Sequence, residues 1–232
     1  MIAEGFVANG ARVYLAGRDA KALHAAVAEL TPLATSAACP GPPVALPANL
    51  QDLSACEELV RRLTAEVEAT GGLHILVNNA GAAWGAPFEE FPDSAWTKVL
   101  TLNLQRAFTL TQLCLPLLSK AATSEDPARV IHIGSIDGVR APVVQNYAYS
   151  ASKAGLHHLS RHLAKDLGPQ NITNNVLACG PFPTKMMKAT LDTMGDVIRG
   201  EVPLRRTGKP EDVAGASLFL ASKAGYVHFL LS

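Results

Sequence analysis

A tyrosine and a lysine lie one helical turn apart in the segment Tyr149-Ser150-Ala151-Ser152-Lys153. Residues at positions i and i+4 share one face of a helix, so the ammonium of Lys153 is expected beside the phenol of Tyr149. A free phenol has a pKa of about 10, and a neighbouring ammonium favours the phenolate and lowers that pKa. The pair could therefore give a proton to an oxygen that gains negative charge, as the reduction of a ketone requires.

Polar residues at the ends of two apolar runs could act with this pair. The run Arg129–Ile133 is followed by Ser135, whose hydroxyl can donate a hydrogen bond to a substrate oxygen. The run 74–78 leads into Asn78-Asn79-Ala80-Gly81, and Asn103 lies in the helical region between the two runs. A Tyr–Lys pair by itself is more often an ordinary pair at a helix surface. These additional residues give the pair its chemical context.

The elements that must position these residues alternate between strands and helices. Five apolar runs have the length of a buried parallel strand: residues 12–16, 44–47, 74–78, 129–133 and 173–177. Helices are expected at residues 1–8, 20–30, 54–70, 93–118, 149–167 and 210–221. Ser54 and Glu57 have the spacing of a capping box, and Asp93 or Ser94 could cap the next helix. The alternation predicts one α/β domain over residues 1–232, with a doubly wound, Rossmann-like parallel sheet.

The composition excludes several classes of protein. The chain has 232 residues, 48% of them hydrophobic, and its 20 basic residues balance 20 acidic ones. It therefore lacks the basic surface expected of a nucleic-acid or membrane-surface protein. No apolar run approaches the roughly 20 residues that span a bilayer. The four scattered cysteines indicate free thiols in a reducing compartment, and a cytoplasmic location is expected.

Together these residues resemble the short-chain dehydrogenase/reductase family. The Asn-Asn-Ala-Gly segment of the family matches Asn78–Gly81, and its catalytic tetrad matches Asn103, Ser135, Tyr149 and Lys153 in order and spacing. The likeness within the family is greatest to NADPH-dependent 3-oxoacyl reductases, including the type found in bacterial rhamnolipid synthesis. The resemblance implies a carbonyl reductase, or an alcohol dehydrogenase in reverse, that takes a small-molecule ketone such as a 3-oxoacyl compound. It also implies a homo-oligomer built on helices such as 88–118 and 149–167.

The resemblance further implies roles for individual positions. The lysine of the family also holds the nicotinamide ribose, and the Asn103 position kinks a helix and holds a water of a proton relay. The backbone of Asn79, Ala80 and Gly81 would pack against the adenine ribose. The adenine would contact Asn49, which replaces the aspartate usual in relatives, and its neighbour Leu50. The nicotinamide end would contact Gly180 and Thr184.

The choice between NADPH and NADH is predicted from the end of the first apolar run. An NAD-dependent enzyme presents a carboxylate there to the ribose 2′-hydroxyl. This chain has Gly17 and Arg18 instead, and the guanidinium could pair with a 2′-phosphate. The sequence therefore favours NADPH, with a solvated loop charge as the alternative role of Arg18.

Both ends of the chain differ from the family pattern. No G-x-G-x-x-G or G-x-x-x-x-G-K motif is present, and the chain opens with an amphipathic stretch where relatives have a strand and a glycine-rich turn. After Gly225 the expected last strand is also altered. Loss of a central strand would leave inward-facing edges unpaired, at about 1–3 kcal/mol for each buried unsatisfied group. Two hypotheses follow: a reductase whose functional form includes residues before Met1, or a truncated, non-catalytic product acting through subunit contacts.

Other candidate sites are weaker. His158 and His162 have the spacing of a helical zinc pair, but no third ligand presents itself, and no metal is expected. The segment Gly134–Gly138 does not match the G-x-S-x-G motif of hydrolases. The residues Met186, Met187, Leu191 and Met194 could form a flexible lid over an apolar substrate, and ordinary helix packing is an equal alternative.

Overall fold

The computed structural model describes residues 1–34 and 39–226. The strands are β1 (Tyr14–Gly17), β2 (Val44–Pro47), β3 (Ile75–Asn78), β4 (Ala128–Ile133) and β5 (Ile172–Leu177). The α-helices are α1 (Ile2–Ala8), α2 (Ala20–Leu30), α3 (Leu53–Val67), α4 (Asp93–Leu100), α5 (Arg106–Ala121), α6 (Tyr147–Leu167), α7 (Lys188–Glu201) and α8 (Pro210–Ala221). Short turns of helix join them: η1 (Thr31–Leu33), η2 (Glu68–Thr70), η3 (Phe88–Glu90), the π-helical turn η4 (Thr101–Gln105), η5 (Ile136–Gly138), η6 (Gly168–Gln170) and η7 (Lys223–Gly225).

The strands pair in parallel, as predicted, but in two groups. Strand β1 pairs with β2, and β4 lies between β3 and β5. Among the described residues β1 and β3 do not pair with each other, so the single sheet expected from the sequence is divided at this point. Residues of β1 and β3 are mostly half-buried, whereas β4 is buried along nearly its whole length. The altered C-terminal segment noted in the sequence, residues 227–232, lies outside the described residues.

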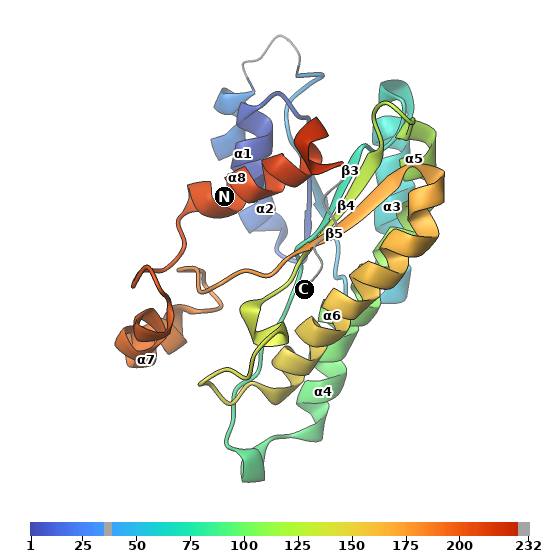
Figure 1. The fold of residues 1–232 in the computed structure, drawn as a ribbon. Coiled ribbons are helices and arrows are strands. Elements are labelled where there is room, and N and C mark those ends of the chain that lie inside the picture. Colours follow the sequence, from blue (N-terminus) through green and yellow to red (C-terminus); the bar gives the residue numbers. More distant parts are fainter. Residues whose placement is uncertain (35–38, 227–232) are drawn as a thin grey trace.

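Helices cover both sides of the strands, which confirms the doubly wound α/β class (Figure 1). On one side α3, α5 and α6 pack against the strands, and on the other side lie α1, α2 and α8. The main core fills the space under α3, α5 and α6, and its fully buried side chains include Cys56, Val67, Leu118, Val130 and Ile172. On the opposite side α1 approaches α8 so closely that a side chain at Gly5 would collide with Ala214.

Two predictions about helix starts are wrong. Ser54 lies inside α3 and forms no capping box, because Asp52 holds the N-cap position. The Asp52 carboxylate accepts a hydrogen bond from the Asn49 side chain at 2.8 Å and does not cap the helix with its side chain. The cap expected at Asp93 or Ser94 is absent because Pro92 precedes α4. The predicted helix 93–118 is interrupted by η4, so it forms two α-helices joined by a wider turn.

A row of buried polar side chains crosses the three-stranded sheet. Asn78 of β3 lies opposite His132 of β4, with its Nδ2 3.3 Å from His132 Nδ1 and 3.1 Å from the Thr111 hydroxyl of α5. On the far side of β4, Ser160 of α6 donates to Asn174 of β5 at 2.8 Å. Burial lowers the pKa of His132 to about 4, so the imidazole is neutral at physiological pH.

Residues 1–34 and 39–226 contain neither a membrane-spanning helix nor a cluster of metal-ligating side chains. No helix there is both long and apolar enough to cross a membrane. No group of three or more histidine, cysteine, aspartate or glutamate side chains there could hold a metal ion. His162, of the candidate zinc pair, lies 3.5 Å from the carboxylate of Asp166.

The core under α5 predicts a large difference between two leucines. We expect Leu118→Ala to lower the free energy of unfolding by about 2–5 kcal/mol, because it deletes a fully buried side chain and leaves a cavity. Leu204→Ala is the matched control, because Leu204 is 74% exposed, and its effect should stay within about 0.5 kcal/mol. Chemical denaturation of the three proteins measures both values, and equal losses would contradict the placement of the core.

Candidate active site

The candidate residues lie where strands end. Strands of one sheet are parallel, so their carboxyl ends meet at one edge, which is where α/β folds bind ligands. Strand β3 is followed by Asn79–Gly81, β4 by Ser135, and β5 by Gly180 and Thr184. In the other sheet β1 is followed by Arg18 and β2 by Asn49. Helix α6 brings Tyr149 and Lys153 to the end of β4, next to Ser135.

Asn103 lies in the π-helical turn η4 and is buried. Its Oδ1 accepts the N–H of Ala82 at 2.7 Å, and its Nδ2 donates to the carbonyl of Ala82 and to the hydroxyl of Ser152, each at 2.9 Å. The Ser152 hydroxyl in turn donates to the carbonyl of Tyr149 at 2.7 Å. Asn103 therefore joins the loop after β3 to the helix that carries Tyr149. The kink that the resemblance implied at this position takes the form of the π-helical turn.

The side chains of Ser135 and Tyr149 interact through a hydrogen bond. Burial raises the pKa of the Tyr149 phenol above its ordinary value, hydrogen bonding with the Ser135 side chain lowers it, and Asp137 and Cys179 raise it further. The Ser135 hydroxyl also accepts the N–H of Asp137 at 3.1 Å, which fixes its place at the start of η5. The phenol is thus kept protonated beside a serine hydroxyl, the form that a proton donor needs.

The ammonium of Lys153, expected beside the Tyr149 phenol, has a backbone carbonyl as its hydrogen-bond partner. Its Nζ lies 5.6 Å from the centre of the Tyr149 ring, yet it donates to the carbonyl of Ile133 at 2.6 Å. The expected lowering of the Tyr149 pKa by this ammonium is wrong for this structure, because burial of the phenol dominates and raises that pKa. Burial also lowers the pKa of Lys153 itself from 10.5 to about 8, with Cys179 acting in the opposite direction.

Sequence reasoning missed two residues of this site, Ser152 and His157. His157 follows Lys153 by one helical turn and Tyr149 by two, so its position on the same face was readable from the spacing. Its Nε2 accepts the backbone N–H of Ser135 at 3.3 Å. Ser152 also lay within the motif, but its link to Asn103 depends on the tertiary structure.

The candidate residues for the adenosine end of a cofactor differ in exposure. Arg18 is exposed and has no ion pair within the described part of the chain. Asn49 is exposed, but its side chain is bound to Asp52. Leu50 is buried in the core, so only its backbone could contact a ligand. Asn79 and Ala80 are exposed, and Gly81 lies so close to Asn103 that a Cβ would be 3.3 Å from its Oδ1.

The loop after β5 carries the candidate residues for the nicotinamide end. Gly180 is exposed, and the N–H of Thr184 donates to the carbonyl of Phe182 at 2.8 Å. The Phe182 ring packs on the backbone of Gly208, where a side chain would collide with it. A hollow of about 170 Å³ lies between this loop and α8, lined by residues that include Cys179, Phe182 and Val213.

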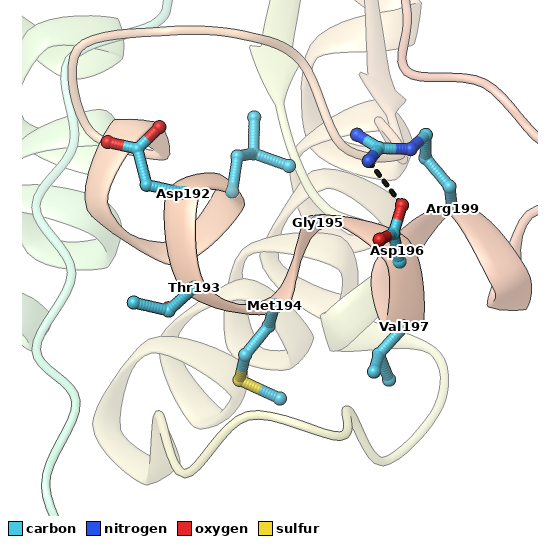
Figure 2. A pocket seen from close by; sticks show the side chains of 8 residues that line it. Asp192, Thr193, Met194, Gly195, Asp196, Val197 and Arg199 are labelled. Carbon is cyan, nitrogen blue, oxygen red and sulfur yellow. Dashed lines mark hydrogen bonds and ion pairs between the residues drawn. The ribbon is translucent and has the colours of Figure 1, made fainter.

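A second hollow of about 170 Å³ lies within α7 and is lined by residues of that helix alone (Figure 2). The helix is broken at Met194, whose φ of −126° and ψ of 15° are not helical. No tetrad residue borders this hollow, so it is not the active site. The lid suggested for Met186, Met187, Leu191 and Met194 stays a prediction.

The chain is similar to known proteins over nearly its whole length. A family model described as enoyl-(acyl carrier protein) reductase matches residues 1–228. The rhamnolipids biosynthesis 3-oxoacyl-(acyl-carrier-protein) reductase of Pseudomonas aeruginosa is 41% identical over 227 residues, which cover 97% of this chain and 85% of that protein. The 3-oxoacyl-(acyl-carrier-protein) reductase of Escherichia coli K12 is 33% identical over 215 residues, covering 92% and 84%. The solved structure of the Pseudomonas aeruginosa RhlG/NADP active-site complex aligns with a TM-score of 0.89 at 40% identity, covering 98% of this chain and 86% of that one.

The low pKa of Lys153 predicts a specific dependence of stability on pH. Unfolded lysine keeps its proton up to about pH 10.5, whereas folded Lys153 releases it near pH 8, so the unfolded state binds more protons in this interval. Its contribution to the free energy of unfolding should therefore rise by about 2 kcal/mol between about pH 7.5 and about pH 9.5.

The measurement is denaturant unfolding of the wild type and of Lys153→Met at both pH values. The raised pKa values of Cys56 and Cys114 act in the opposite direction, but equally in both proteins. Cys179 loses the pKa-lowering charge of Lys153 in the variant, which makes the difference between the two proteins larger. The difference in the free energy of unfolding between the wild type and the variant should therefore rise with pH. An identical pH dependence of the two proteins would contradict the prediction.

Proposed function

The chain belongs to the short-chain dehydrogenase/reductase family, and from that membership we propose that it reduces 3-oxoacyl thioesters with NADPH. It is an oxidoreductase that acts on CH–OH groups and uses NADP(H). The observation that carries the proposal for this chain is the gathering of Ser135, Tyr149 and Lys153 at the end of β4, with a protonated phenol beside the serine hydroxyl.

These residues can perform the protein's share of a carbonyl reduction. When bound, NADPH supplies the hydride that the carbonyl carbon accepts. The Ser135 hydroxyl can donate a hydrogen bond to the carbonyl oxygen, which stabilises the negative charge that develops there. The Tyr149 phenol, protonated at neutral pH, gives its proton to that oxygen. Lys153 can then supply a proton toward Tyr149, because its pKa of about 8 lies close to physiological pH.

The residues present fit the two ends of NADP(H). The exposed guanidinium of Arg18, without an ion pair among the described residues, suits the 2′-phosphate of the adenosine ribose. The exposed Asn79 and Ala80 are available to the same ribose, and Gly180 and Thr184 to the nicotinamide. Lys153 would hold the nicotinamide ribose, in exchange for the Ile133 carbonyl or beside it.

Exposed apolar side chains support an acyl substrate. Trp84 follows β3, Val139 and Val143 follow β4, and Met186 follows β5, and all four are at least 38% exposed. They lie on the loops that carry Ser135 and the candidate cofactor residues, where an acyl chain could cover them. Relatives named as 3-oxoacyl-(acyl-carrier-protein) reductase and acetoacetyl-CoA reductase are consistent with that substrate class. A homo-oligomer remains part of the proposal.

The first experiment is a fluorescence titration of the purified chain with NADPH, after cooperative thermal unfolding has been confirmed, followed by an assay with acetoacetyl-CoA. We expect saturable binding and oxidation of NADPH that depends on the thioester. A folded protein that neither binds NADPH nor oxidises it would overturn the proposal and favour the non-catalytic product considered from the sequence.

Tyr149→Phe tests the proton donor. The variant keeps the ring but loses the hydroxyl, so kcat should fall by about 10²–10⁴-fold while the Kd for NADPH stays within about threefold. Steady-state turnover and the fluorescence titration measure the two effects separately. Unchanged turnover would remove Tyr149 from the mechanism.

Arg18→Ala tests the choice of cofactor. Loss of a charge-assisted hydrogen bond to phosphate costs about 1.5–3 kcal/mol, so the Kd for NADPH should rise about 10- to 100-fold. NADH lacks the 2′-phosphate, and its Kd should change by less than about threefold. Lys21→Ala, on the exposed first turn of α2, is the control for general loss of positive charge. Equal losses for the two cofactors would contradict the assignment.

A further inference from the structure

We propose that His157 is a positioning residue for the reduction, which holds Ser135 in place through the backbone. The inference rests on the proposed function only for its kinetic readout. His157 is 5% exposed and lies on the same face of α6 as Tyr149 and Lys153. The position of its imidazole at the end of β4 is therefore set by the helix that also carries the proton donor.

The backbone of the Ser135 loop shows why such a residue is needed. The N–H groups of Gly134 and Ile136 continue the pairing with the chain of β5, donating to Leu177 at 2.8 Å and to Cys179 at 2.9 Å. The N–H of Ser135, between them, points away from β5, and the pairing of β3 with β4 has already ended at Asn78 and His132. A buried N–H without an acceptor is destabilising. Nε2 of His157 accepts this N–H at 3.3 Å, in place of the carbonyl of a neighbouring strand.

The loop is also shaped to the ring. A side chain at Gly134 would collide with Nε2 of His157, and a Cβ at Gly138 would lie 3.0 Å from its Cε1. Gly138 also lies against the backbone of Lys153 and Ala154. Two glycines thus allow the loop to rest directly on the imidazole and on the turn of α6 before it. A larger residue at either place would move the loop that carries Ser135.

The contact requires one tautomer of the ring. An acceptor Nε2 carries no proton, so the neutral imidazole must hold its proton on Nδ1. Burial, followed by the charges of Lys153 and Arg161, lowers the pKa of His157, so the ring is neutral at physiological pH. His157 itself touches neither substrate nor cofactor in this proposal. It acts by setting the position of Ser135, whose side chain forms a hydrogen bond with Tyr149.

A matched pair of variants separates positioning from packing. His157→Met fills a similar volume but offers only a weak acceptor, whereas His157→Gln can place an amide oxygen close to the position of Nε2. We expect His157→Met to lower kcat roughly 10- to 100-fold, because a small displacement of a catalytic group has an effect of that size. His157→Gln should retain kcat within about threefold of the wild type. The Kd for NADPH should stay within about threefold in both variants. Equal losses of kcat in the two variants, or no loss in either, would overturn the proposal.

A double-mutant cycle with Ser135→Ala tests the route of the effect. If His157 acts through Ser135, then His157→Met added to Ser135→Ala should lower kcat by less than about twofold further, because the group that it positions is already gone. A further loss equal to that of the single variant would contradict the proposal.

A third measurement uses the wild type and needs neither folded variants nor turnover. The ¹⁵N shifts of the histidine side chains report which ring nitrogen carries the proton. We expect a neutral His157 with its proton on Nδ1, and a proton on Nε2 would overturn the contact with Ser135. If the wild type shows this tautomer but reduces no 3-oxoacyl thioester, the proposed function fails while the Ser135–His157 contact stands.

Discussion

Two hydrogen bonds tie the end of β4 to one face of α6. The carbonyl of Ile133 accepts Lys153 Nζ at 2.6 Å, and the N–H of Ser135 is donated to His157 at 3.3 Å. Lys153 and His157 are one helical turn apart, so α6 cannot rotate or slide along β4 without breaking both bonds. Tyr149 belongs to the same face and is carried with them. The relative position of the phenol and the serine hydroxyl therefore depends on backbone groups of β4 as much as on the two catalytic side chains.

Asn103 supplies a second connection, from the opposite direction. Its one amide group holds the loop after β3 through Ala82 and reaches α6 through Ser152. The π-helical turn η4 widens the backbone at this point of an otherwise continuous helical region. The candidate cofactor residues after β3 and the proton donor on α6 thus share one buried support. Apolar packing forms the core beneath them, and polar side chains set the distances between the loops above it.

Local periodicity was enough to predict much of this fold. The bounds of α2, α8 and β2 agree with the expected ranges to the residue, because apolar spacing and Pro210 mark them within a short window. The sequence did not predict the hydrogen-bond partner of a side chain that has several possible partners. Asp52 binds Asn49 and forms no side-chain cap, and Lys153 donates to a carbonyl 20 residues earlier. The support of Asn103 joins segments 21 and 49 residues away in the chain, so no local pattern could reveal it.

The row of polar side chains across β3, β4 and β5 has a consequence for the accuracy of folding. Short, apolar, parallel strands offer little to distinguish the native alignment from one displaced along the sheet. If β4 slipped by one residue, Asn78 would face Ile131 or Ile133 in place of His132, and the contact between its buried amide and the His132 ring would be lost. The polar contacts of the row therefore stabilise the native register of the strands relative to shifted registers. The member of the row in β4, His132, belongs to the strand that leads into Ser135, so the row disfavours the errors of alignment that would misplace the catalytic loop.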